Sequence, residues 1–152
     1  MAEEQQQPVF NIEKIYVKDL SVEVPNAPAI FLEREAPQMD VQMSTDSRML
    51  SDGMYHTSIT VTVTAKSGDK TMFLVECSQA GIFRIQNVPQ DQLPLVLGIG
   101  CPNIVFPYLR ETVSDVVIRA GFPPLLLNPV NFEALFQQQQ LAQQQQAAPQ
   151  TH

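Results

Sequence analysis

The feature that most constrains the fold is the alternation of side-chain character from residue 54 to residue 66. Successive side chains of a β-strand point to opposite faces of a sheet, so this alternation predicts a strand with one buried face and one wetter face. Turn-forming residues follow at 66–70, and residues 71–85 return as a partner strand, which predicts an antiparallel hairpin. The mostly apolar parity of the first strand comprises Tyr55, Thr57, Ile59, Val61, Val63 and Ala65, and the polar parity comprises His56, Ser58, Thr60, Thr62 and Thr64.

Two more strands are predicted before this hairpin. Residues 9–24 have one mostly apolar parity and one mixed parity. Pro25 and Pro28 end this strand, because proline cannot continue a hydrogen-bonded ladder. A weaker alternation of apolar residues at 39–43 predicts the other strand. In the hairpin itself, Gly81 interrupts the return strand and suggests a β-bulge.

After the hairpin the period of the apolar residues becomes helical. A short helix is predicted over residues 91–98, with Pro94 in its first turn, where a missing N–H costs little. A longer helix is predicted from an N-cap at Asn103 up to Gly121, with Pro123 just beyond it as a stop and Pro107 early enough to be tolerated. Its broad, valine-rich apolar stripe indicates that both a sheet and a partner helix cover it.

The last predicted helix begins at Asn131. Val130 and Leu135 occupy the two positions of a hydrophobic staple around that cap. The order along the chain is therefore four strands followed by helices. This order predicts an α+β fold with helices packed on one face of a four-stranded antiparallel sheet.

The length and composition of the chain suggest one folded domain between two tails. The 152 residues fit a single domain, which we place at 8–136. Residues 1–7 and 137–152 are rich in glutamine and offer little apolar surface, so we expect flexible tails. Glutamine also tolerates helix well, so the second tract could instead prolong the preceding helix.

The charge of the chain restricts the classes of partner. The formal net charge is −7 at pH 7, and the sequence pI is about 4.6. Binding to nucleic acid or to anionic membrane surfaces requires clustered Lys and Arg, so we expect neither, and basic partners are favoured. We find no signal peptide and no apolar run that approaches the length of a membrane span. We therefore expect a soluble, cytoplasmic protein without membrane insertion.

Residues with catalytic potential are few. The two histidines are His56, on the polar parity of a strand, and the terminal His152. An ordinary surface residue is the favoured interpretation of His56, rather than a general base. Cys101, just before the predicted longer helix, could have a lowered thiol pKa. Pro102 separates it from the helix cap, however, and a buried structural thiol is favoured.

These residues do not demand an enzyme. Cys77 and Cys101 lack the spacing of metal ligands, so we expect reduced thiols, no metal and no cofactor. A small oligomeric thiol enzyme or ligand-binding protein that uses Cys101 remains the alternative to a protein that acts by association.

Acidic residues of the first and fourth strands form a candidate docking site. Asp19 and Glu23 are four residues apart and share a strand face. Glu76 lies in an apolar stretch beside Leu74, which is an unusual place for a charge. A solvated sheet face with incidental acids is one interpretation. The other is an acidic patch, with Leu74 as an apolar anchor, that docks a basic partner.

Several segments of the chain together match one known family in order and in spacing. These segments are residues 10–21, 25–28, 79–83, 101–108, 121–125 and 129–132. From residue 10 to about residue 136 the chain therefore resembles the SecB protein-export chaperones.

The resemblance implies a four-stranded antiparallel sheet with helices, assembled as a dimer of dimers. In that family the helices are sandwiched between sheets at the centre of the homotetramer, which makes Val113, Val116 and Val117 candidate interface residues. It also implies an ATP-independent holdase that keeps secretory precursors unfolded and delivers them to the translocation motor SecA.

The resemblance also implies a role for the acidic patch. The positions of Asp19, Glu23, Leu74 and Glu76 match those through which the family docks a basic, zinc-containing tail of SecA. The zinc would belong to the partner. The docking interpretation of the patch is therefore favoured over incidental acids.

Candidate client-binding residues are aromatic or apolar and lie at helix ends or in proline-rich connections. They are Tyr108, Phe122, Leu126 and Phe136, and packing within the chain is the alternative for each. The chain has no Trp, whereas the family often carries one near the position of Glu35. One wall of the client groove is therefore expected to differ. The Gln-rich tract after Phe136 has no specific match, and we assign it no role.

Overall fold

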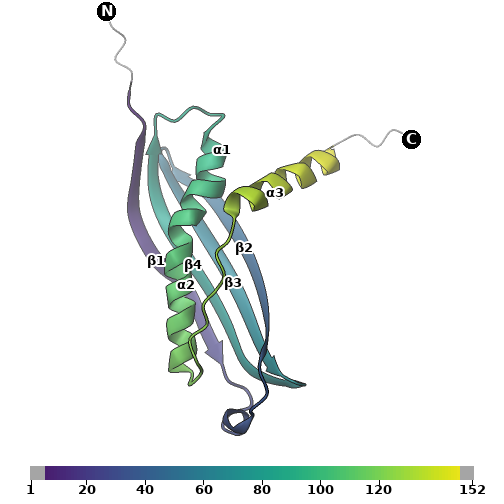
Figure 1. Cartoon of the computed structure of the whole chain (residues 1–152). Helices are drawn as coiled ribbons and strands as arrows, with labels where there is room; N and C mark the ends of the chain where they lie inside the picture. The colour runs from purple at the N-terminus through teal and green to yellow at the C-terminus, as the bar shows by residue number, and fades with distance from the viewer. Residues whose placement is uncertain (1–5, 148–152) are drawn as a thin grey trace, which may run out of the picture.

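The computed structural model describes residues 6–147 and consists of a four-stranded sheet with a long helix across one face (Figure 1). The strands lie in the order β1-β4-β3-β2, and all neighbours are antiparallel. This arrangement confirms the predicted α+β class and the predicted hairpin. The bounds of the strands are Val9–Glu23 (β1), Gln38–Ser51 (β2), Met54–Ser67 (β3) and Lys70–Gln86 (β4).

Two β-bulges in β1 explain why its alternation is imperfect. The pairing with β4 shifts between Ile12 and Lys14 and again between Val17 and Asp19. Each extra residue exchanges the two faces of the strand. The prediction of one continuous apolar parity was therefore wrong between the bulges, where Tyr16 turns to the polar face. The residues of β1 that lie on the helix side are Phe10, Ile12, Ile15, Val17, Leu20 and Val22.

Gly81 does not lie at a bulge, contrary to the sequence-based prediction. It pairs in register with Thr57 on β3 and with Ile15 on β1. A Cβ at this position would lie 2.8 Å from the Phe83 ring and 3.1 Å from the Ile15 side chain. Phe83 is fully buried, so its ring cannot move aside easily. Glycine is needed because a neighbouring ring covers its backbone.

One continuous helix, Leu93–Arg119, replaces the two predicted helices. α1 (Leu93–Leu95) continues through a π-helical turn, η2 (Val96–Gly100), into α2 (Cys101–Arg119). Pro94 lies at the start of the helix as predicted. Asn103 and Pro107 both lie well inside it, so the N-cap and the early position predicted for them were wrong.

The length of this helix also corrects the expectation about membrane spans. By length and composition its 27 residues could cross a bilayer. In the structure α2 lies across β3 and β4, and one of its faces forms the core (Figure 1). The fully buried side chains of that face are those of Cys101, Val105, Leu109, Val113 and Val117.

The helix ends where the sequence predicts, at Gly121. This residue has φ +97°, a conformation that glycine adopts without steric cost. The Gly121 N–H donates to the Ile118 carbonyl at 2.9 Å, and the Phe122 N–H donates to the Val117 carbonyl at 3.2 Å. These two bonds form a Schellman motif, which satisfies the last carbonyls of the helix.

The final helix, α3 (Phe132–Ala147), begins as predicted at Asn131. The Ala134 N–H donates to Asn131 Oδ1 at 3.0 Å, which is an N-cap hydrogen bond. The glutamine tract is helical up to Ala147, which agrees with the alternative that this tract prolongs the preceding helix. The remaining parts of the expected tails, 1–5 and 148–152, lie outside the described residues.

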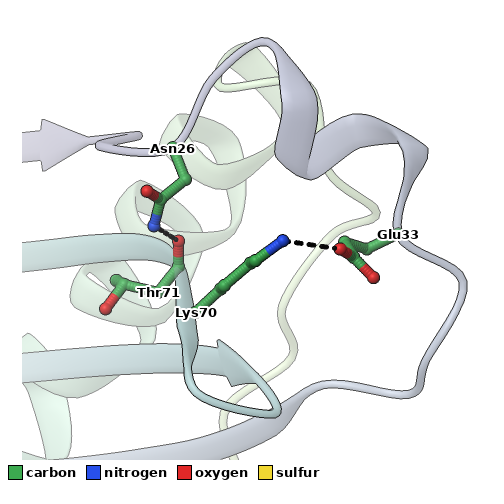
Figure 2. A network of polar contacts seen from close by, with 4 residues as sticks. All are labelled: Asn26, Glu33, Lys70 and Thr71. Atoms are coloured by element: carbon green, nitrogen blue, oxygen red, sulfur yellow. Dashed lines mark hydrogen bonds and ion pairs between the residues drawn. The ribbon is translucent and has the colours of Figure 1, made fainter.

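The connection between β1 and β2 is attached to the turn between β3 and β4. Asn26 Nδ2 donates to the Thr71 carbonyl at 2.9 Å, and Lys70 Nζ lies 3.2 Å from Glu33 Oε1 (Figure 2). Within this connection the short helix η1 (Ala29–Leu32) buries Ile30 in the core. The connection is therefore packed as well as hydrogen-bonded.

We expect Gly81→Ala to destabilise the fold by about 1–3 kcal/mol, because the new methyl group overpacks a filled core. Urea unfolding measures the loss. Phe83→Leu removes the ring that the methyl group meets, so the double variant should lose less than the sum of the two single losses. Strictly additive losses would contradict this assignment of the clash.

Candidate functional site

The face of the sheet opposite α2, here called the open face, carries the predicted acidic patch. Residues paired directly across neighbouring strands share a face, so the register of the strands gives successive rows. Asp19, Glu23, Leu74 and Glu76 all lie on the open face within three rows. The rows are Glu23–Leu74–Thr64–Asp40, Ser21–Glu76–Thr62–Gln42 and Asp19–Ser78–Thr60–Ser44.

The alternation of β4 explains the unusual position of Glu76. Phe73, Val75 and Cys77 point into the core, so Leu74 and Glu76 point to the open face. A shallow cavity of about 190 Å³ lies here, lined by residues of β1, β3 and β4 that include Glu23, Leu74 and Glu76. The structure thus brings the predicted anchor and two predicted carboxylates together. Asp19 lies one row further on.

Asp40 is a fourth carboxylate at this end of the open face, in the same row as Glu23 and Leu74. Sequence reasoning missed it because β2 is an edge strand with weak alternation; the register with β3 was the missing signal. We call Asp19, Glu23, Asp40 and Glu76 the acidic end. All four are exposed, and none takes part in an ion pair among the described residues. An apolar anchor surrounded by unpaired carboxylates suits a basic segment.

His56 is buried rather than on the surface, which corrects the sequence-based interpretation. Only 4% of it is exposed. Its Nε2 lies 2.6 Å from the hydroxyl of Tyr16, which the first bulge turns to the same face. Burial, and then the positive charges of Lys18 and Arg48, lower the pKa of His56, while Asp46 raises it. We therefore interpret His56 as a neutral group that joins β3 to β1 across β4.

Both thiols are buried and protonated. Burial raises the pKa of Cys101 to about 11, although a hydrogen bond with Thr57 acts in the opposite direction. The helix-terminus argument for a reactive thiol does not apply, since Cys101 follows two turns of helix that begin at Leu93. Burial and the nearby charge of Asp19 raise the pKa of Cys77 to about 11 as well. The interpretation of Cys101 as a buried structural thiol is confirmed.

The four candidate client-binding residues fall into two groups. Tyr108 is 46% exposed and Leu126 is 75% exposed, so both are available to a ligand. Phe122 is buried between Phe31 and Phe73, with ring centroids 5.1 and 4.9 Å away. Phe136 is half-buried, and its ring lies where a side chain on Gly98 would be. The last two residues therefore pack within the chain.

An apolar groove that sequence reasoning missed lies between β2 and the connection from α2 to α3. Its volume is about 290 Å³, and none of the four candidate client-binding residues lines it. Two weak signals could have located it: the apolar alternation at 39–43 and the proline-rich connection. The lining residues are Val41, Met43, Val61, Phe106, Leu127, Asn128, Pro129 and Val130.

The three candidate interface valines belong to the core of the single chain. Val113 and Val117 are fully buried, and Val116 is 8% exposed. On the outer side of the same helix, Ile118 is 51% exposed and lines a second cavity, of about 490 Å³, together with Leu126. Apolar residues of β1 on the helix side are exposed as well. They are Phe10, Ile12, Val17, Leu20 and Val22, with exposed fractions between 37% and 49%.

We expect burial of His56 to make the stability of the fold depend on pH. The folded state holds the pKa of His56 below its ordinary value of 6.5, so below that pH the unfolded chain binds more protons. The free energy of unfolding is therefore unaffected by His56 above about pH 6.5, and it decreases as the pH falls below that value. His56→Gln should remove this component, so that acidification destabilises the variant less. A stability difference between the two proteins that is independent of pH would contradict the prediction.

Comparison with known proteins agrees with this geometry. Residues 3–145 match the family described as "Preprotein translocase subunit SecB". The chain is 86% identical over 148 residues to the protein-export protein SecB of Thiobacillus denitrificans, with 97% of both proteins covered. It is 59% identical over 157 residues to that of Methylobacillus flagellatus, with 100% of both covered.

A solved structure supports the fold alone. It is the Mycobacterium tuberculosis SecB-like chaperone in complex with a ChAD peptide from the HigA1 antitoxin, with a TM-score of 0.65 at 17% identity. The match covers 80% of this chain and 90% of that one. Given the family match and the full-length relatives, the chain belongs to the SecB family of protein-export chaperones.

Proposed function

We propose that this protein is a cytoplasmic, ATP-independent holdase that binds unfolded secretory precursors on apolar surface and docks the motor SecA on the acidic end of its open face. The observation that carries the proposal is the separation of the two surfaces. The carboxylates and Leu74 lie on one face of the sheet, and the exposed apolar residues lie on the other face and at its edges. Client and motor could therefore be held at once.

The apolar groove beside β2 suits an extended client. β2 is an edge strand, so its outer backbone groups can pair with a client strand while alternate client side chains enter the groove. Burying one Leu or Phe contributes roughly 1.5–3 kcal/mol. Micromolar affinity needs about 8 kcal/mol, so several side chains must engage together. A folded protein does not present them, which gives selectivity for unfolded chains.

Assembly as a homotetramer, a dimer of dimers, is part of the proposal. The exposed apolar residues on the helix side of β1, and Ile118 on the outer side of α2, support it because they are available to another copy. Val113, Val116 and Val117 are buried in the core of the single chain and are not available to another copy. Four copies at −7 each carry a formal charge of −28, which would attract basic unfolded segments and a basic tail of SecA. One long client could span several grooves and gain avidity.

The holdase activity is tested by refolding a slow-folding precursor with and without stoichiometric protein and without nucleotide. We expect refolding to be arrested, with a stable complex of precursor and protein. Unhindered refolding in the presence of a well-formed oligomer would contradict the proposal, because the architecture would then lack the activity.

The docking surface is tested by charge reversal. We expect Glu76→Lys and Asp19→Lys each to weaken SecA binding about tenfold at low salt, because each replaces an attraction to a basic tail with a repulsion. Arrest of precursor refolding should be unchanged. Asp91→Lys, an equal change of charge at an exposed position in the connection between β4 and α1, is the matched control. Equal loss of docking and client binding would contradict the assignment of the patch.

The interface is tested on the two sides of α2. Val113→Asp should destabilise the chain by several kcal/mol, because an unpaired charge would be buried in its core. Ile118→Asp should leave the fold stable and reduce the mass in solution, because that side chain is exposed in the single chain. Thermal unfolding and analytical ultracentrifugation distinguish the two effects. An unchanged mass for Ile118→Asp would place this side of the helix outside the interface.

A further inference from the structure

The open face has a basic end as well as an acidic end. Beyond the acidic rows, the next rows across the sheet are Tyr16–Ala80–Ser58–Asp46 and Lys14–Ile82–His56–Arg48. Lys18 occupies the second bulge of β1 and acts on the same histidine as Arg48. We call Lys14, Lys18 and Arg48 the basic end. All three are exposed.

The charges of the basic end are not neutralised by ion pairs within residues 6–147. Among the described residues, none of the three takes part in an ion pair. The next cation along β4, Arg84, is paired with Glu13 at 3.0 Å and contributes no net charge. Asp46 is the one carboxylate in the two rows, and Asp19 of the acidic end adjoins Lys18, so the three cations still outnumber the carboxylates beside them on a protein whose total charge is −7.

A hydrogen bond between two side chains of the open face holds the surroundings of the basic end in place. Tyr16 and His56 lie in neighbouring rows beneath these cations and bond to each other. His56 Nδ1 is buried and has no hydrogen-bond partner within residues 6–147. A protonated imidazole here would add a buried positive charge between Lys18 and Arg48. The neutral form leaves the positive charge at the surface, on side chains that a ligand can reach.

We propose that the open face is a docking site with two poles, and that the docked partner segment carries an acidic stretch that lies over Lys14, Lys18 and Arg48. This inference rests on the proposed docking of a basic stretch at the acidic end. Ile82 lies six positions after Glu76 on β4, so the row of Lys14 and Arg48 is about 20 Å from the row of Glu76. Lys18, next to Asp19, lies between these two rows. An extended partner segment of roughly six residues or more joins the two rows.

The second pole fixes the direction of the partner. A uniformly basic segment could lie across the acidic end in either direction, and any part that reached the basic end would be repelled. A segment with both charges is attracted at both ends in one orientation and repelled at both ends in the other. The face would therefore select one orientation and reject basic segments without the acidic stretch.

The test asks whether charge reversal at the basic end weakens or tightens SecA binding, and compares this with charge reversal at the acidic end. Full-length SecA from the same organism is titrated with the unaltered protein and with Lys14→Glu, Lys18→Glu and Arg48→Glu, without client and at low salt. We expect each variant to bind SecA roughly three- to tenfold more weakly, with the difference reduced at higher salt. Arg34→Glu, an equal change at an exposed position of the β1–β2 connection, should have no such effect.

The alternative gives the opposite result. If the docked segment is only basic, reversal at the basic end removes repulsion and tightens binding. Tighter or unchanged binding by these variants would overturn the two-pole inference. The parallel titration of Glu76→Lys tests the proposed docking separately: weaker binding by that variant preserves it even if the two-pole inference fails. No binding of SecA by the unaltered protein would overturn both.

Discussion

The packing of one helix on a four-stranded sheet determines how much apolar surface this chain exposes. α2 contributes five fully buried side chains to the core and lies mainly over β3 and β4. A helix is about 10 Å wide and neighbouring strands are about 4.8 Å apart. One helix therefore covers two strands, and the helix sides of β1 and β2 need other cover. On β2 the connection from α2 to α3 supplies part of it and leaves a groove.

This geometry separates the proposed functions by face. Apolar side chains that the helix does not reach remain on its side of the sheet, where clients or other copies of the chain can bury them. In the part of the chain that the structure describes, α2 packs on the other face of the sheet, so the side chains of the open face are free to be charged. In β4 the alternation places Val75 and Cys77 in the core and Leu74 and Glu76 on the open face. One strand thus serves both the core and the docking surface.

Sequence patterns predict those parts of the fold that depend on local chemistry. The β3–β4 hairpin, the stop at Gly121 and the cap at Asn131 follow from alternation, a left-handed glycine and a side-chain hydrogen bond. The bulges of β1 and the continuity of the helix depend on tertiary packing instead. Gly98, Gly100 and Pro102 are poor helix formers. Burial of the apolar face of α2, and packing of the Phe136 ring against Gly98, outweigh that cost.

The charge pattern of the docking surface also depends on tertiary structure and could not be predicted from the sequence alone. Composition gives a net charge of −7 and predicts a basic partner, and the acidic end agrees with that prediction. Net charge is a sum over the chain, however, whereas a partner senses the charges within about a Debye length, 8–10 Å. The register of four strands decides which charges are neighbours, and here it gathers Lys14, Lys18 and Arg48 around a buried histidine. An acidic protein can therefore present a basic site, and the bulges that carry Tyr16 and Lys18 to the open face help to create it.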